Sequence, residues 1–183
     1  VRTFAGTRLD DLVGNPPEGG PATSGGVGRP TSIGVDADGK IYFVSSTGPA
    51  LFEIEPDGFM RRLLPIPDHG LASLAVGPDG ALYLGQTGAF SGVMRREPSG
   101  ELSILAGTIL NNGTPLANFA TSEGEAAAAA QLANLQSIAV DANATSIFAG
   151  DSDGQIFESR DGGDRRPVIA DLAPVSKGDF YRA

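Results

Sequence analysis

The stretch SIGVDADGKIYF, at Ser32–Phe43, is followed 41 residues later by SLAVGPDGALYL at Ser73–Leu84, and a third version, SIAVDANATSIF, occupies Ser137–Phe148. In each copy a short, half-apolar run leads into a turn rich in Asp, Gly or Asn, and an apolar run that favours β-structure follows. The pair Asp38-Gly39 is typical of a two-residue hairpin turn. The repeat therefore predicts antiparallel strands joined by tight turns.

Two further strands are expected after each copy; in the first they are Leu51–Ile54 and Leu63–Leu64, on either side of a Pro-Asp-Gly turn. Four short strands at a period near 41 residues are the pattern of a propeller blade. A single four-stranded sheet buries too little apolar surface, so neighbouring blades must cover both of its faces. The predicted fold class is all-β, a β-propeller of four-stranded antiparallel blades, with about three blades in this chain.

We expect residues 1–183 to form a single propeller segment, with blades at about 31–65, 72–107 and 136–172 and long connecting loops at 7–30 and 108–135. The two loops correspond to each other, because EGGPATSGGVGRPTSI from Glu18 aligns without gaps with EGEAAAAAQLANLQSI from Glu123. The middle blade lacks such a loop. The long loop therefore belongs to the blade pattern.

An arc of three blades exposes an apolar face at each end, which invites association. Further blades from the same polypeptide, or a second copy completing a six-bladed ring, would cover these faces. VRTFAG at Val1–Gly6 and RRPVIADL at Arg165–Leu172 both match the fourth strand of a blade, so the chain holds thirteen candidate strands, one more than three blades need. These two segments would compete for one place in a head-to-tail dimer, which favours a segment of a larger propeller.

The composition excludes several partners. The formal net charge is -9, which argues against a nucleic-acid partner and against an anionic membrane surface. No apolar run approaches the ~18 residues of a membrane span. There is no cysteine, and His69 is the only histidine. Thiolate sites and metal centres that need two histidines are therefore ruled out.

The motifs AGT at Ala5–Thr7, EGGPAT from Glu18 and PTSIGVDADGKIYF from Pro30 resemble the NHL-repeat family of β-propellers. The likeness is to the bacterial extracellular type, whose long loop commonly reads G-D-G-G-P-A-T, and it covers nearly the whole chain. It implies a propeller fold and an extracellular or cell-envelope location. It says little about ligands, because family members bind protein, RNA or small molecules. The Asp that usually follows the second strand is present only at Asp151, so these blades are divergent.

The long loops are expected to crowd one face of the propeller, which the connections between second and third strands share. Binding residues concentrate on such loops. We predict that this loop face binds a protein or a glycan, with these candidate binding residues: Arg8, Glu18, Arg29, Phe90, Phe119, Glu123, Asp151 and Asp153. The same side chains also have purely structural explanations. The acidic ones can simply be solvated, Arg29 can hold its own loop in place, and Phe90 and Phe119 can pack within the loops.

The predicted function is a non-catalytic binding or scaffold module without a cofactor, and we assign no catalytic residue. Calcium stays possible at Asp151–Gly154, whose side-chain oxygens alternate suitably, although the closing Glu of a calcium-binding hand loop is missing. The alternative is a lactonase- or lyase-type enzyme with a divalent cation in the central channel. Asp36, Asp141, Asp151 and Asn143 could serve it only if they face the channel, and Asp36 and Asp141 are expected toward the turn face.

Overall fold

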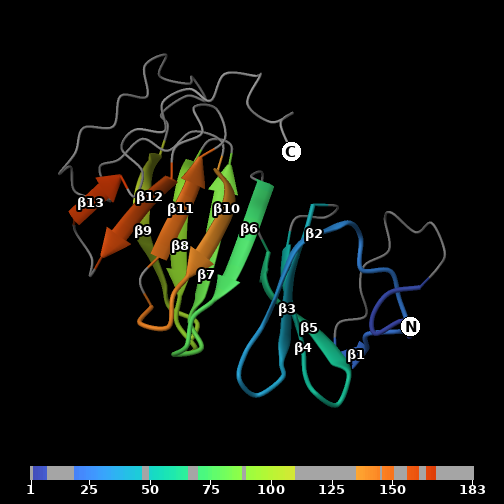
Figure 1. Cartoon of the computed structure of the whole chain (residues 1–183). Helices are drawn as coiled ribbons and strands as arrows, with labels where there is room; N and C mark the ends of the chain where they lie inside the picture. The colour runs from blue at the N-terminus through green and yellow to red at the C-terminus, as the bar shows by residue number, and fades with distance from the viewer. Residues whose placement is uncertain are drawn as a thin grey trace, which may run out of the picture.

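The computed structural model describes residues 2–7, 19–46, 50–65, 70–87, 90–109, 135–144, 146–150, 156–160 and 164–167. This part of the chain contains thirteen strands and no helix (Figure 1). Every pair of neighbouring strands is antiparallel. Within the described ranges, no helix has the length and apolar character needed to cross a bilayer.

The described strands form three sheets, which we call blades A, B and C. Blade A contains β2 (Pro30–Val35), β3 (Ile41–Ser45), β4 (Ala50–Ile54) and β5 (Phe59–Pro65), and the two-residue β1 (Gly20–Pro21) pairs with the outer edge of β5. Blade B contains β6 (Gly70–Val76), β7 (Leu82–Thr87), β8 (Phe90–Arg96) and β9 (Leu102–Ile109). Blade C contains β10 (Leu135–Val140), β11 (Ser146–Gly150), β12 (Ile156–Arg160) and β13 (Asp164–Pro167). The predicted four-stranded antiparallel units are confirmed.

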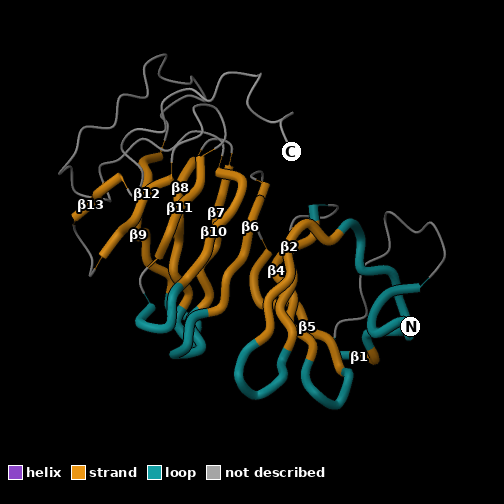
Figure 2. Tube along the Cα trace, viewed as in Figure 1, coloured by secondary structure: helices purple, strands orange, loops and turns teal. Residues whose placement is uncertain are grey.

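The tight turns lie at one end of the sheets (Figure 2). The turn between β2 and β3 differs from the predicted two-residue hairpin. Asp36 N donates to Lys40 O at 3.0 Å and Gly39 N donates to Asp36 O at 3.2 Å, so three residues form the loop. Only its last residue, Gly39 with φ of 83°, is left-handed. This is a type I turn followed by a left-handed residue, which glycine adopts without a Cβ clash.

Blades A and B pack face to face. Side chains alternate along β3, so Tyr42 and Val44 face blade B while Phe43 faces away from it. The shared core contains Tyr42, Val44, Leu51, Leu71, Leu74, Leu82 and Leu84. The inner strands β2 and β6 run next to each other in this interface.

Blade B is covered on its second face by blade C. Val93 and Ala106 of blade B form a core with Leu135 of blade C, and Ile138 packs against it. The side chains of β7 from Leu82 to Gln86 are buried throughout, as expected for a strand enclosed on both faces. Blade B therefore has a neighbour on each face, as the sequence predicted.

The outward face of blade A is partly covered by the N-terminal part of the chain. Ala5, Ala22 and Val27 pack over Phe43 and its neighbours on the outer strands. The predicted strand at Val1–Gly6 is wrong, because Arg2–Thr7 are not in a strand. Within the described residues no neighbouring strand pairs with this segment, and a strand needs hydrogen-bonding partners. The thirteenth described strand is instead β1, inside the region expected to be a connecting loop.

Candidate functional site

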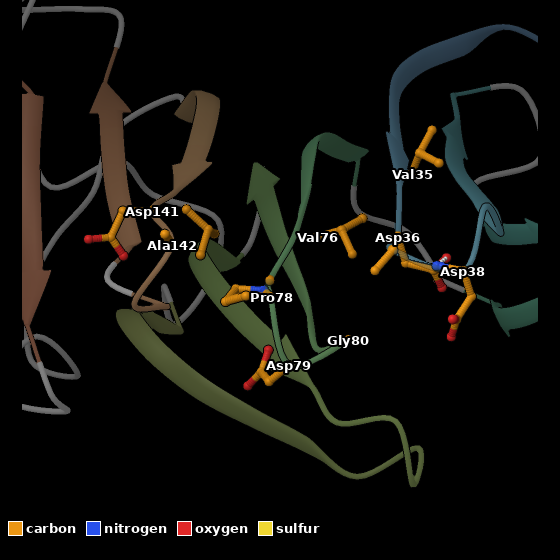
Figure 3. A pocket seen from close by; sticks show the side chains of 12 residues that line it. Val35, Asp36, Asp38, Val76, Pro78, Asp79, Gly80, Asp141 and Ala142 are labelled. Atoms are coloured by element: carbon orange, nitrogen blue, oxygen red, sulfur yellow. Dashed lines mark hydrogen bonds between the residues drawn. The ribbon is translucent and has the colours of Figure 1, made fainter.

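A hollow of about 460 Å³ lies where the first turns of the three blades converge. Its wall is made by the β2–β3, β6–β7 and β10–β11 turns, and equivalent positions of the repeat recur around it (Figure 3). The last residue of each inner strand contributes a valine: Val35, Val76 and Val140. The turns add carboxylates, three of which, Asp38, Asp79 and Asp141, are exposed. The hollow therefore combines aliphatic and acidic side chains.

In blade A, Asp36 holds its turn together. Its Oδ1 accepts hydrogen bonds from the N–H groups of Asp38 at 3.0 Å and Lys40 at 2.8 Å. Its Oδ2 accepts a hydrogen bond from the Tyr42 hydroxyl at 3.2 Å. Burial, and after it the nearby Asp36 carboxylate, raises the pKa of Tyr42 well above its ordinary value, so Tyr42 stays a donor. Asp36 is thus occupied by the turn that it stabilises.

In blade B, the position of Asp36 is taken by Gly77. A Cβ there would lie 2.6 Å from Asp79 Oδ1 and 2.9 Å from a ring carbon of Tyr83, so no side chain fits. Asp79 instead accepts from Ala81 N at 3.1 Å and forms an ion pair with Arg95 of β8. Burial works to raise the pKa of Asp79, but these two partners hold it below its ordinary value.

In blade C, Asp141 plays the role of Asp36. Its Oδ1 accepts from Asn143 N at 3.0 Å, and its carbonyl accepts from Ala144 N at 3.1 Å. Ala144 stands where blade A has Gly39, and its φ of 65° makes it the one non-glycine residue with positive φ in the described ranges. The hydroxyl of Tyr83 reaches across from blade B to the Ala144 carbonyl at 3.4 Å. Blades B and C are therefore tied together at the rim of the hollow.

A second charged cluster lies on blade A. The buried carboxylate of Glu53 on β4 forms ion pairs with Arg61 of β5 and with Lys40, whose Nζ is 3.8 Å away. Lys40 also contacts Glu55 at 3.0 Å, and this hydrogen bond raises the pKa of Lys40 despite the opposing effect of burial. The charges in this cluster compensate one another, as a structural network requires.

Most loop-face candidates from the sequence lie outside the described residues: Arg8, Glu18, Phe119, Glu123, Asp151 and Asp153. Arg29 is described and exposed, just before β2, at the end of the blade opposite the tight turns, and its carbonyl accepts from Ser46 N at 3.0 Å. Phe90 begins β8 at the same end of blade B. The possible calcium ligands at Asp151–Gly154 also fall outside the described ranges. Among the described residues, no three His, Cys, Asp or Glu side chains gather as a metal site would need.

The hollow was not predicted as a site, although a signal for it exists. Asp36 and Asp141 line it, on the turn face where the sequence placed them. That signal is a valine followed by a turn that contains Asp, which recurs in all three copies. Inner strands of neighbouring blades lie side by side, so their equivalent turns must converge.

No protein-family model matches the chain, and no curated protein matches it. Solved structures with the same fold include virginiamycin B lyase from Staphylococcus aureus, with 19% identity and a TM-score of 0.52 over 75% of this chain. A chain of a nidogen/laminin complex has 15% identity and a TM-score of 0.57 over 78%. YCF48 bound to D1 peptide has 18% identity and a TM-score of 0.53 over 80%.

The chain spans 40%, 49% and 41% of the lengths of these three chains, respectively. At such identities the likeness concerns the fold, and it agrees with the blades described above. The chain therefore has the β-propeller fold.

Proposed function

We propose that this chain is part of an NHL-like, extracellular β-propeller that binds a protein partner, and that the hollow at the turn face receives a basic segment of that partner. The observation that carries the proposal is the composition of the hollow, in which valines from three blades meet exposed carboxylates. A Lys or Arg side chain can lay its aliphatic stem on the valines while its charge meets Asp38 or Asp141.

The state of the carboxylates favours binding over catalysis. Asp36, Asp79 and Asp141 each accept at least one backbone hydrogen bond that closes their own turn. A metal ion or a reacting group would have to displace these bonds, whereas the ammonium or guanidinium group of a basic peptide can approach the exposed side of a carboxylate that keeps its turn bond. The net charge of -9 adds a long-range attraction for a basic partner.

The similar structures agree with a binding role without selecting it. They include a nidogen/laminin complex and YCF48 bound to D1 peptide, but also virginiamycin B lyase. A β-propeller can support binding or catalysis, so the proposed function rests on the residues of the site and not on the fold. The loop face, with protein or glycan as partner, is the competing location.

The test is selection of a displayed random peptide library on the immobilised chain. We expect enrichment of peptides rich in Lys and Arg, whose binding weakens as salt is raised. The double variant Asp38→Asn/Asp141→Asn removes two charges and keeps the acceptor oxygen at position 141. It should weaken binding about tenfold or more.

Asp57→Asn is the matched control, since Asp57 caps the β4–β5 turn through Phe59 N at 3.1 Å and does not line the hollow. It should leave binding unchanged. Binding that survives the double variant but is lost in Arg29→Glu would move the site to the loop face. A library that yields no enriched peptide would contradict the proposal.

A further inference from the structure

The inner strands of the three blades share one pattern. Each carries two small residues on the side of the following blade and two larger aliphatic residues on the side of the preceding blade. The small residues are Ser32 and Gly34 on β2, Ser73 and Ala75 on β6, and Ser137 and Ala139 on β10. The aliphatic residues are Ile33 and Val35, Leu74 and Val76, and Ile138 and Val140.

The contact between β2 and β6 shows how the two sides fit. Ser32 Oγ accepts a hydrogen bond from Leu74 N at 3.0 Å and lies 3.4 Å from Leu74 O. A Cβ at Gly34 would lie 2.7 Å from Val76 Cγ2. The small side of one inner strand is therefore pressed against the aliphatic side of the next.

The interface between blades B and C uses the aliphatic side in the same way. Ile138 of β10 packs on the core formed with Val93 of blade B. Its Cδ1 lies only 3.0 Å from the position of a Cβ on Gly85, in the second strand of blade B. An aliphatic residue of each later inner strand thus enters the preceding blade.

The two ends of the arc expose the two halves of this contact. At the blade A end, Ile33 is 67% exposed and Val35 is 57% exposed. At the blade C end, Ser137 and Ala139 are exposed. The N-terminal residues cover the outer strands of blade A and leave this aliphatic strip open. The exposed aliphatic side of β2 at one end is therefore complementary to the exposed small side of β10 at the other end.

We propose that a second copy of this chain docks head to tail, with β10 of one copy packed against β2 of the other. Ser137 and Ala139 then meet Ile33 and Val35, as Ser32 and Gly34 meet Leu74 and Val76 within the chain. Two such contacts close a ring of six blades, within the usual size range of propellers. The open strip is narrow because the N-terminal residues cover the outer strands, so association is reversible and depends on concentration.

The test is sedimentation equilibrium of the 183-residue chain from about 1 μM to about 1 mM, a range that brackets weak association. The mass is expected to rise from one chain to two and no further, since a closed ring has no free end. Val35→Asp places a charge in the apolar contact, and Ala139→Arg overfills the small side. Each is expected to weaken association at least about tenfold.

Both positions are exposed in the single chain, so the variants should keep the wild-type circular dichroism spectrum. Leu102→Asp is the matched control, because Leu102 is an exposed aliphatic residue on the outer strand β9. It should associate as the wild type does. In an equal mixture of the Val35→Asp and Ala139→Arg variants, a mixed dimer can form. One of its two contacts is the native one and the other brings the introduced Asp against the introduced Arg, so dimer should reappear.

Two results would overturn the proposal. One is a chain that keeps its single-chain mass over the whole concentration range. The other is a dimer that Val35→Asp disrupts and Ala139→Arg leaves intact, because this would indicate a symmetric contact between two blades A.

Discussion

The substitution Gly85→Ala tests how closely Ser73 of blade B and Ile138 of blade C pack around Gly85. A Cβ at this position would lie 2.3 Å from Ser73 Oγ on the paired strand and 3.0 Å from Ile138 Cδ1 in blade C. Ordinary contacts between such atoms are about 3.5 Å, so both neighbours must move. Overfilling a packed core in this way costs about 1–3 kcal/mol. We expect the midpoint of urea unfolding to fall, and Tm to fall by about 2–4 °C for each kcal/mol.

A double-mutant cycle with Ser73→Ala identifies the cause. Within the described part of the chain, Ser73 Oγ is buried and has no hydrogen-bond partner, so its removal should cost little or even stabilise. In the Ser73→Ala background the worse of the two overlaps is absent. The coupling free energy between the two substitutions should therefore reach about 1 kcal/mol in the favourable direction.

Gly70→Ala is the matched control on the same sheet. A Cβ at Gly70 would meet only Thr87 Oγ1 at 3.6 Å, an ordinary contact, so this variant should be neutral or slightly stabilising. If Gly85→Ala unfolds at the wild-type urea concentration, the close packing around Gly85 is refuted. If Ser73→Ala brings no recovery, the overlap with Ser73 is not the cause of the cost, and the contact with Ile138 of blade C carries it.

Three further predictions concern single side chains. Ala144→Gly relieves a left-handed alanine, which costs about 1–2 kcal/mol, against a glycine entropy cost of about 0.5–1 kcal/mol, so Tm should rise slightly in a thermal melt. Asp79→Asn keeps an acceptor for Ala81 N but loses the ion pair with Arg95, at a cost of about 0.5–1 kcal/mol near neutral pH. Because the folded-state pKa of Asp79 is lowered, this loss is present above the ordinary pKa of 3.8 and should disappear in melts as pH falls below it. Leu84→Ala leaves a cavity in the core between blades A and B and should cost about 2–5 kcal/mol by urea unfolding; a cost below about 1 kcal/mol would mean that this core is not packed as described.

The sequence predicted the blades because their information is local. Alternation of apolar residues, and turns at Asp36–Gly39, Gly77–Gly80 and Asp57–Gly58, define strands whose hydrogen-bond partners are their chain neighbours. The type of turn was less predictable. Asp38-Gly39 suits a two-residue hairpin, but the bonds that Asp36 makes to the backbone favour the three-residue form.

The candidate site depended on relations that the linear pattern does not contain. Val35, Val76 and Val140 are far apart in the sequence, and only the adjacency of inner strands brings them to one hollow. The loop-face prediction rests on the tendency of loops to carry function, and this tendency says nothing about which carboxylates already have partners. The ion pair of Asp79 with Arg95 and the turn bonds of Asp141 appear only in three dimensions.

The sequence alone determined that this protein is built from four-stranded antiparallel units of one repeating kind, since each unit is specified by strands and turns within about forty residues. Only the tertiary structure decided which of the strand-like and apolar segments in blade A are paired and buried. Arg2–Thr7 has the residue pattern of a strand, yet no strand in the described part of the chain pairs with it, and it packs on blade A as irregular chain. Ile33 and Val35 have the same character as Leu74 and Val76, yet they remain exposed. The reason is physical: a side chain is buried, and a strand is hydrogen-bonded, only where a neighbour is present to meet it.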